Sequence, residues 1–538
     1  MAMIRWTPPS EVSPQEAYLL KRCQKKRRLF AFLREHRHEI FDEECQRELE
    51  TMYRASGAGK EPLCPGLMAM ALIVQGYLGV SDAEAVELTV VDLRWQMVLD
   101  RLGASVPAFS QGALFAFRER LIAHDMDRRL LERTAAIARS SQGFDAKQLP
   151  KTLRIALDAS ALAGAGRVED TINLIGHAAR KVVECAAALI EREYAWVCRQ
   201  AGIPLLLASS VKKALDCDWS DTGEKAAAVD RLAQQVLRLE RWLERHLGEE
   251  MRRPPLGDVL GVLHELMDQD LEPDPEGNGQ RIIQGVAEDR RISVEDAQMR
   301  HGRKSKSRRI DGYKRHVATD LDTQAIVACA ITPANQPERD ALGELKADLD
   351  GQGLRVGEAH FDRGYMGSPV VEEMAAQDTV IICKPWKQDN GALFSKADFA
   401  LDLRAKTITC PGGQCLPMAY GETVMFPAPA CDACPLRRQC TTASNGKGRS
   451  VHIAEDEPRQ KKLRAMSKTK SGRQRFRERV PVEHRLAHIG QRQGPQARYI
   501  GTRKNLYDLR RAAVIQNLET AQRKETARHK ATPLRKAA

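Results

Sequence analysis

The sequence predicts an α/β protein with a mixed β-sheet at its centre and helical segments before and within it. Three observations favour this class: apolar alternation that indicates a strand at 153–158, two short strands around a tight turn at 312–331, and a strand–helix–strand order at 354–383. Strand, hairpin, strand, helix and strand in this order are typical of a mixed sheet. With 538 residues and 43% hydrophobic content, the chain has room for about three domains with real cores.

Residues 1–145 predict a helical domain. The run 65–77 has the pattern of a buried helix, Ser81 and Glu84 have the spacing of a capping box, and 110–121 indicate an amphipathic helix with basic residues on one side. A bundle of this kind serves either DNA binding or dimerisation, and the sequence leaves the two open.

The predicted sheet is interrupted by a helical insertion. Residues 150–175 and 290–390 supply the strands, whereas 176–285 return to apolar residues at helical spacing. Two consecutive prolines and a stretch rich in Pro and Gly at 272–279 mark the end of this insertion.

Three further segments complete the organisation. Residues 391–457 hold a cluster of cysteines, and 458–518 return to basic helix as the last part of the core. Residues 519–538 are rich in Lys, Arg and Ala and have no apolar periodicity, which predicts a basic, disordered tail.

The charge of the chain favours a polyanionic partner. Lys and Arg total 84 against 72 Asp and Glu, a net charge of +12. The excess gathers at 300–316, 458–479 and 498–538, and such clustering favours contact with phosphates. Aromatic residues make up only 5% of the chain, which argues against an open platform for stacking bases.

The sequence lacks the features of an exported or membrane protein. The N-terminus has no apolar stretch before its first charges, and the longest apolar run, near 67–74, is far shorter than the ~18 residues of a membrane span. We therefore expect a cytoplasmic protein with thirteen reduced cysteines, so that a cluster of them indicates a metal site rather than disulfides.

Three acidic residues have settings suited to metal-binding carboxylates. Asp158 and Asp362 each close a predicted strand, and Pro481 predicts that Glu483 lies in the first turn of a helix. Two strand-end aspartates and a helical glutamate can hold two Mg²⁺ ions, with Asp158 bridging both. Taken singly, the aspartates have an ordinary alternative as turn or cap residues, and Glu483 as an i, i+4 ion-pair partner of Arg479. Asp170, shortly after Asp158, has two interpretations, a fourth acidic group near the metal ions or, more simply, a helix cap.

The cysteine segment predicts a structural zinc site. Cys431 and Cys434 form a CxxC pair, whose spacing lets two thiolates reach one tetrahedral ion. We favour Cys410 and Cys440 as the other two ligands, with Cys415 competing for one position. Such a site would stabilise a small zinc-ribbon-like insertion.

Basic residues near the acids are candidate contacts to a DNA backbone, independent of base sequence. They are Arg303, Lys304, Arg308, Arg309, Lys314, Arg363 and Arg479. Trp386 has two interpretations, a residue that stacks on an unpaired base or a core or lid residue.

Four motifs taken in order resemble those of bacterial insertion-sequence DDE transposases. They are Ile155-Ala-Leu-Asp158-Ala-Ser160, Gly312-Tyr-Lys-Arg-His316, Phe361-Asp-Arg-Gly-Tyr365 and Arg479-x₃-Glu483. Residues 62–125 are similar to the helical N-terminal domain of such transposases, and 499–518 to their carboxyl end. The resemblance implies a ribonuclease H-like core whose catalytic triad is Asp158, Asp362 and Glu483. In the related signature a tyrosine stands where this chain has Phe476, and a lysine where it has Gly490.

The resemblance also implies what the protein does. We expect it to bind the terminal inverted repeats of its own element, and to cleave and join double-stranded DNA with Mg²⁺. A homodimer or higher oligomer on DNA, near the nucleoid, is expected. Two alternatives stay open: a DNA-binding regulator that has lost the chemistry, and a ribonuclease H-like nuclease that cuts without joining.

Overall fold

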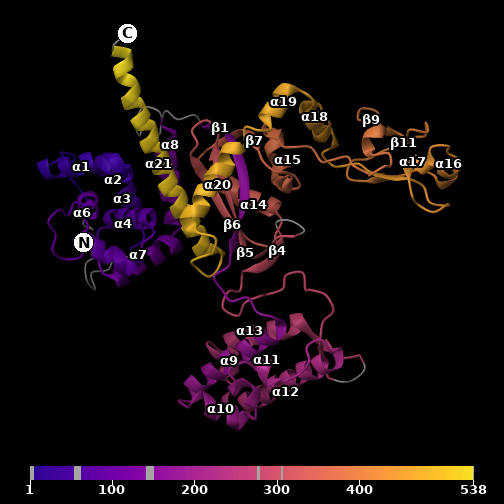
Figure 1. The fold of residues 1–538 in the computed structure, drawn as a ribbon, viewed down its shortest axis with the longest axis horizontal. Helices are drawn as coiled ribbons and strands as arrows, with labels where there is room; N and C mark the ends of the chain where they lie inside the picture. Colours follow the sequence, from indigo (N-terminus) through magenta and orange to yellow (C-terminus); the bar gives the residue numbers. More distant parts are fainter. Residues whose placement is uncertain (1–4, 54–61, 141–150, 276–278, 304–306, 537–538) are drawn as a thin grey trace.

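The computed structural model describes residues 5–53, 62–140, 151–275, 279–303 and 307–536. The sheet lies at the centre, with the helical bundle on one side, the small cysteine-bearing unit extending on the other and the helical insertion below, and the long last helix runs beside the sheet (Figure 1). The predicted mixed α/β class is confirmed, because the central sheet contains both parallel and antiparallel pairs.

The N-terminal bundle forms because most of its helices begin at a capping side chain and bury an apolar face. Ser13 and Glu16 form a reciprocal capping box, and Ser81 accepts a hydrogen bond from the backbone of Glu84. The helix at 65–78 is buried along most of its length, as its sequence predicts. The helices are α1 (Pro14–Lys26), α2 (Arg28–Ile40), α3 (Glu43–Glu50), α4 (Pro65–Leu78), α5 (Asp82–Val91), α6 (Leu93–Val98), α7 (Gln111–Ala123) and α8 (Met126–Arg139).

The central sheet has the strand order β4-β5-β1-β7-β8, and β6 pairs with the same edge of β5 as β4 does. β1 is antiparallel to β5 and parallel to β7, and β7 is parallel to β8. The strands are β1 (Thr152–Ala163), β4 (Arg300–Arg303), β5 (Arg309–Asp320), β6 (Ile326–Pro333), β7 (Arg355–His360) and β8 (Val380–Ile382).

Two details of the sheet differ from the sequence prediction. β1 continues to Ala163, so Asp158 lies inside the strand rather than at its end, because the far half of β1 pairs with β5. Residues 300–303 pair with residues 309–312 as β4 and the start of β5, a strand pair that the sequence analysis did not predict. Local periodicity does not reveal the pairing of β1 with β5, which lies far away in the chain, and the polar residues at the β4–β5 pairing show no apolar alternation.

Helices cover both faces of the sheet. Ile155 and Leu157 pack in one core with Leu345 and Met374, whereas Leu162 and Ile326 belong to a second core shared with the last helices and the bundle. The helices and turns are η4 (Glu338–Asp340), α14 (Ala341–Gly351), η5 (Arg363–Tyr365), α15 (Pro369–Ala376), α18 (Glu457–Lys468), α19 (Lys470–Arg475), α20 (Val480–Gln493) and α21 (Thr502–Lys536).

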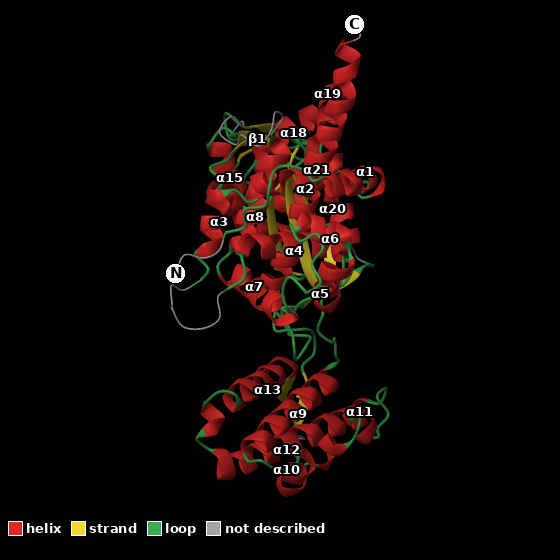
Figure 2. Cartoon of the chain, turned by 90° about the vertical axis from the view of Figure 1, so that its left-hand side faces the viewer, coloured by secondary structure: helices red, strands yellow, loops and turns green. Residues whose placement is uncertain are grey.

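The helical insertion forms a lobe with its own core, set apart from the sheet (Figure 2). It begins at Thr171, earlier than predicted, because Asp170 caps its first helix by accepting from the backbone of Asn173. This confirms the interpretation of Asp170 as a cap. The elements are α9 (Thr171–Leu189), α10 (Tyr194–Ala201), η2 (Pro204–Leu207), α11 (Val211–Ala214), α12 (Thr222–Leu247), η3 (Glu250–Arg252), α13 (Leu256–Asp270), β2 (Leu271–Pro273) and β3 (Gln280–Ile282).

The cysteine-bearing unit is a small β-rich body with a core that includes Phe399, Ile408 and Phe426. It contains a three-stranded sheet and a two-stranded hairpin. Its elements are η6 (Lys396–Asp398), β9 (Ala400–Asp402), β10 (Thr407–Thr409), β11 (Cys415–Pro417), β12 (Thr423–Met425), α16 (Ala428–Asp432), α17 (Arg437–Cys440) and β13 (Ser450–His452).

The end of the chain corrects the prediction of a disordered tail at 519–538. α21 continues to Lys536, and Lys524 donates a hydrogen bond to the carbonyl of Ala138 while Glu525 pairs with His36. Ala, Lys, Arg and Glu are strong helix formers, so a helix already fixed by packing at 502–518 propagates without apolar periodicity. Among the described helices, none is by itself long and apolar enough to cross a membrane; α4 and α5 meet that test only as a pair, bent by 104°.

Arg510 of α21 joins the bundle to the sheet. Its guanidinium pairs with Asp125 and Asp127 at the start of α8 and with Asp348 of α14, at 2.6, 3.2 and 3.0 Å. Asp127 and Asp348 are buried, so this cation neutralises charges that water does not reach.

Replacing Arg510 with Ala should therefore destabilise the fold by about 3–5 kcal/mol, because it leaves buried carboxylates without a counter-ion. Urea unfolding followed by circular dichroism measures the loss. Arg523→Ala, an exposed change on the same helix, is the control and should stay within about 0.5 kcal/mol of wild type. Equal midpoints for the two variants would contradict the role given to Arg510.

Candidate active site

The parallel pairing of β1 and β7 brings the two aspartates together. Ala156 of β1 pairs with His360 of β7, and each aspartate lies two residues further along its own chain segment. Because parallel strands run in the same direction, Asp158 and Asp362 emerge side by side. The strand order thus produces a geometry that the sequence spacing alone does not.

Glu483 reaches the same place from α20. It lies in the first turn of that helix, as Pro481 predicts. One turn earlier, Arg479 contacts both acids: its Nη2 is 3.1 Å from Asp362 Oδ2 and 3.1 Å from Glu483 Oε1. A second contact joins Nη1 to the other oxygen of Asp362. The structure therefore brings Asp158, Asp362, Arg479 and Glu483 into one site.

The electrostatics of this site couple its members. Burial raises the pKa of Asp158, and the negative charges of Asp362 and Glu483 raise it further, while Arg479 opposes both. Burial alone lowers the pKa of Arg479, but the surrounding carboxylates Asp362 and Asp158 outweigh it and raise that pKa. Arg479 is therefore the counter-ion of the acidic cluster. A cation that binds the carboxylates, or a phosphate that binds the guanidinium, changes the charge balance between them.

The carboxylates present suit divalent cations. They offer hard oxygen ligands, and the one hydrogen bond that the described residues donate to Asp158 comes from the backbone of Ala159, at 2.9 Å to Oδ1. Oδ2 of Asp158 therefore remains available as a ligand. In the described chain the three acids do not bring one oxygen each within 4.8 Å of the others.

The turn after Asp362 is held by a buried pair that the sequence analysis did not identify. Tyr365 Oη lies 2.8 Å from His316 Nδ1, and His316 Nε2 lies 3.0 Å from Thr332 Oγ1. Burial lowers the pKa of His316 to about 3, so the ring is neutral, and one of its nitrogens donates while the other accepts. Both residues stand in motifs quoted above, but only the fold shows that they meet.

The predicted DNA contacts have different surroundings. Arg303, Arg308 and Arg309 are exposed on the β4–β5 hairpin, whereas Lys304 lies outside the described residues. Lys314 instead donates to the carbonyl of Gln336 at 2.6 Å, and burial lowers its pKa. A lysine tied to the protein backbone in this way is less suited to phosphate contact than the exposed arginines.

Arg363, directly after Asp362, lies beside the aromatic ring of Trp386. Its guanidinium carbon is 5.9 Å from the ring centroid, and its Nε donates to the carbonyl of Lys384 at 3.2 Å. Trp386 is 50% exposed, so its interpretation as a core residue is wrong. The pair forms an exposed rim next to the acids.

The two departures from the related signature have structural reasons. Phe476, at the tyrosine position, is buried in the core beneath the sheet. Gly490, at the lysine position, faces Arg315: a Cβ atom there would lie 3.3 Å from Arg315 Nη2. Arg315 in turn bonds Ser160 Oγ at 2.8 Å, two residues beyond Asp158. A guanidinium from β5 thus stands where the signature has a lysine.

Four of the five clustered cysteines line one cavity of about 230 Å³, namely Cys410, Cys431, Cys434 and Cys440. Cys415 is exposed and does not line it. Burial raises the pKa of the Cys440 thiol, and the charges of the other three add to this. In the described structure no three of these sulfur atoms lie within 4.8 Å of one another, so the four thiols line the cavity without meeting at one point.

Two family models match the chain. Residues 409–521 match the transposase DDE domain, and residues 20–120 match a transposase domain of the DUF772 type. The first match includes Glu483 and the four cavity cysteines but neither aspartate, so the link from Glu483 to Asp158 and Asp362 comes from the geometry. No curated protein and no solved structure matches the chain.

The low pKa of His316 leads to a prediction about the stability of the fold in acid. Its folded pKa of about 3 lies below the usual 6.5, so between these values the unfolded chain binds a proton that the folded chain does not. Stability should fall as pH falls through this window, by about 1.4 kcal/mol per unit below 6.5. We expect His316→Gln to lack this component in urea unfolding at a series of pH values. Parallel pH profiles for wild type and variant would contradict a neutral, buried His316.

Proposed function

We propose that this chain, two parts of which match transposase family models, is an insertion-sequence DDE transposase that binds the inverted-repeat ends of its element and catalyses Mg²⁺-dependent cleavage and strand transfer. The observation that carries the proposal is the convergence of Asp158, Asp362 and Glu483 around one arginine. The sheet order, three antiparallel strands continued by two parallel ones, supports a ribonuclease H-like core.

Each acid has a role in the proposal. Asp158, the most buried of the three, would be a ligand shared by the Mg²⁺ ions, and Asp362 and Glu483 would supply the remaining carboxylate ligands. The ions would supply an activated oxygen nucleophile and stabilise the leaving oxygen. Water is the nucleophile of the cutting step and releases a 3′-hydroxyl, and this hydroxyl is the nucleophile of the joining step. Both are in-line displacements at phosphorus in which one P–O bond forms as another breaks, so no covalent bond to the protein forms.

Arg479 binds phosphate in this scheme. In the structure its guanidinium is engaged by Asp362 and Glu483. A DNA phosphate offers a bidentate acceptor of the same shape as a carboxylate, so the side chain transfers from the acids to the scissile region when DNA is bound. Arg363 and the exposed arginines of the β4–β5 hairpin extend the contact along the DNA backbone.

The N-terminal bundle supplies a second DNA surface. Residues 17–34 contain no acid, and the cations at the junction of α1 and α2 are exposed. These are Lys21, Arg22, Lys25, Lys26, Arg27 and Arg28. Such a cluster of cations without neighbouring acids favours docking on DNA. Because two ends of the element must be held together, we expect a dimer or larger assembly on chromosomal DNA in the cytoplasm.

We propose Zn²⁺ as a structural ligand of the cysteine-bearing unit, held by Cys410, Cys431, Cys434 and Cys440. A Cβ atom on Gly412 would lie 2.9 Å from Cys434 Sγ and 3.7 Å from Cys410 Sγ, so two of the thiols flank one glycine. Glycine at this position lets them approach each other.

The catalytic proposal predicts that Asp158→Asn, Asp362→Asn and Glu483→Gln each lower cleavage of labelled inverted-repeat DNA by at least about 10³-fold, because each removes a charged metal ligand. Gel assays with Mg²⁺ measure cutting and joining separately, and Glu372→Gln, an exposed acid on α15, is the control. Binding without cleavage by wild type would favour the regulator, and cleavage without joining the nuclease. Full activity of Asp362→Asn would refute the mechanism.

The zinc proposal predicts one Zn²⁺ per chain in protein purified under reducing conditions. Cys434→Ser should lose the metal and lower the melting temperature of the cysteine-bearing unit, because the ion links its segments. Cys415→Ser, whose side chain is exposed, should keep both. Elemental analysis that finds no zinc in wild type, or equal loss in both variants, would contradict the ligand set.

A further inference from the structure

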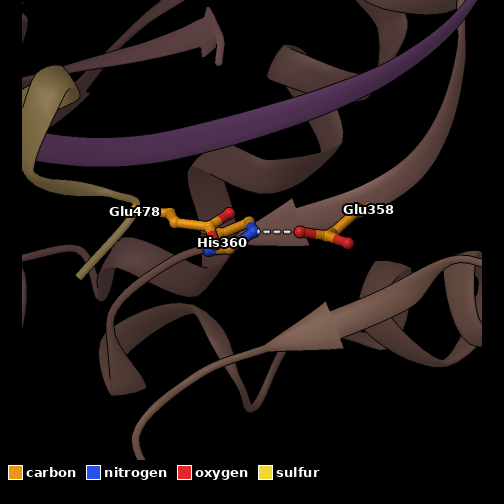
Figure 3. A group of neighbouring side chains, drawn as sticks. All are labelled: Glu358, His360 and Glu478. Carbon is orange, nitrogen blue, oxygen red and sulfur yellow. Dashed lines mark hydrogen bonds and ion pairs between the residues drawn. The ribbon is translucent and has the colours of Figure 1, made fainter. Parts of the chain in front are cut away.

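A second charged cluster lies close to the proposed catalytic acids. Glu358 and His360 come from β7 and Glu478 from the segment between α19 and α20, and one ligand atom of each lies within 4.8 Å of the others (Figure 3). His360 is 1% exposed, and its Nε2 lies 2.5 Å from Glu358 Oε1. By composition, this group resembles a metal site.

Arginines occupy the position that a cation would take. Arg154 Nη2 lies 3.2 Å from Glu358 Oε1 and also contacts Glu478. Arg475 Nη2 lies 2.5 Å from the other oxygen of Glu358. Two guanidinium groups therefore already balance the two carboxylates, and a divalent ion would have to displace them. The contacts describe an ion-pair network rather than a metal centre.

The network joins the three segments that carry the proposed triad. Arg154 lies on β1 four residues before Asp158, on the same face of the strand, and pairs across to Glu358 in the β1–β7 register. Glu358 and His360 precede Asp362 on the same face of β7. Arg475 and Glu478 come just before Arg479 and Glu483. Each segment that carries a residue of the proposed triad thus contributes at least one charged side chain to the network.

We propose that Arg154, Glu358, His360, Arg475 and Glu478 form a positioning network that sets the distance of the glutamate-bearing segment from the two aspartates. The inference rests on the proposed function, since it assigns a purpose to the network in that chemistry. Besides the network, the segment before α20 is joined to the sheet by the burial of Phe476 and by Arg479, whose guanidinium is itself needed for phosphate.

Because the ion pairs of the network are exposed, their effect on catalysis can be distinguished from an effect on the stability of the fold. Arg154 is 41% and Glu478 34% exposed in their side chains, and ion pairs this open to water contribute little to folding. A shift of the glutamate relative to the aspartates by about 1 Å is enough to lower a rate roughly 100-fold. Loss of the network should therefore reduce catalysis far more than it reduces stability.

The test uses Arg154→Ala, Glu478→Ala, the double variant and Arg154→Lys. Glu358 and His360 are left unchanged because their burial makes misfolding a confounding result. The matched control is Arg281→Ala with Glu272→Ala, an ion pair of similar exposure in the helical insertion. Single-turnover cleavage of labelled ends, DNA affinity, the Mn²⁺ concentration for half-maximal cleavage, and calorimetric Mn²⁺ affinity without DNA are measured for each.

We expect each single Ala variant to cut about 10–100-fold more slowly, to require more Mn²⁺ and to bind it more weakly in calorimetry, while DNA affinity and melting temperature match the control. The double variant should lose no more than the worse single variant, because both changes break one network. Arg154→Lys, which keeps the charge, should recover part of the rate.

Three outcomes would overturn the inference. Cleavage and Mn²⁺ affinity equal to those of the control pair would show that the network positions nothing. Additive losses in the double variant would show two independent effects. An extra bound ion that Glu478→Ala removes, in a background of Asp158→Asn, would make the cluster a metal site instead. If wild type itself neither binds Mn²⁺ nor cuts, the proposed function fails, and the inference with it.

Discussion

The site depends on one constraint, the parallel register of β1 against β7. Ala156 opposite His360 fixes Asp158 and Asp362 as neighbours, and no other pairing of these strands does so, since a slip of one residue would turn one carboxylate to the other face. Arg479 then draws Glu483 to the pair through contacts with Asp362 and Glu483. The strand register places the two aspartates side by side, and the guanidinium of Arg479 holds Glu483 next to them.

The rest of the fold keeps this register in place. α21 packs along the sheet, Asn517 bonds both the N–H and the carbonyl of Ile326 at 2.8 and 2.9 Å, and Arg510 ties the bundle to α14. The last helix therefore holds together parts of the chain that the helical insertion and the cysteine-bearing unit separate in sequence. These two bodies have cores of their own, so they can be inserted without disturbing the sheet.

Sequence patterns predicted the features that depend on neighbouring residues. The strand at 153–157, the helix beginning just before Glu483 and the cap at Asp170 all follow from local periodicity or capping chemistry. The extension of β1 beyond Asp158 depends on a distant partner, β5, and local patterns do not contain it. β4 pairs with nearby residues, but these are polar and show no apolar alternation that would indicate a strand. The tail at 519–538 was misjudged because a helix held by packing can continue through residues that bury little.

The same distinction holds for the candidate site. Asp158, Asp362, Glu483 and the cysteines were recognisable as residue types in suitable settings. The pair Tyr365–His316, the place of Arg315 beside Gly490 and the network around Glu358 were not, because each joins side chains from different elements. Polar side chains that meet only after folding have no regular spacing in the sequence, so the sequence does not reveal their contacts.

The account is tested most directly by counting the Mn²⁺ ions that the purified chain binds, using electron paramagnetic resonance. It predicts two ions per chain, with binding lost when Asp158, the shared ligand, is changed to Asn. Mn²⁺ binding that is absent in wild type, or that survives Asp158→Asn unchanged, would contradict a two-ion site built on these three acids.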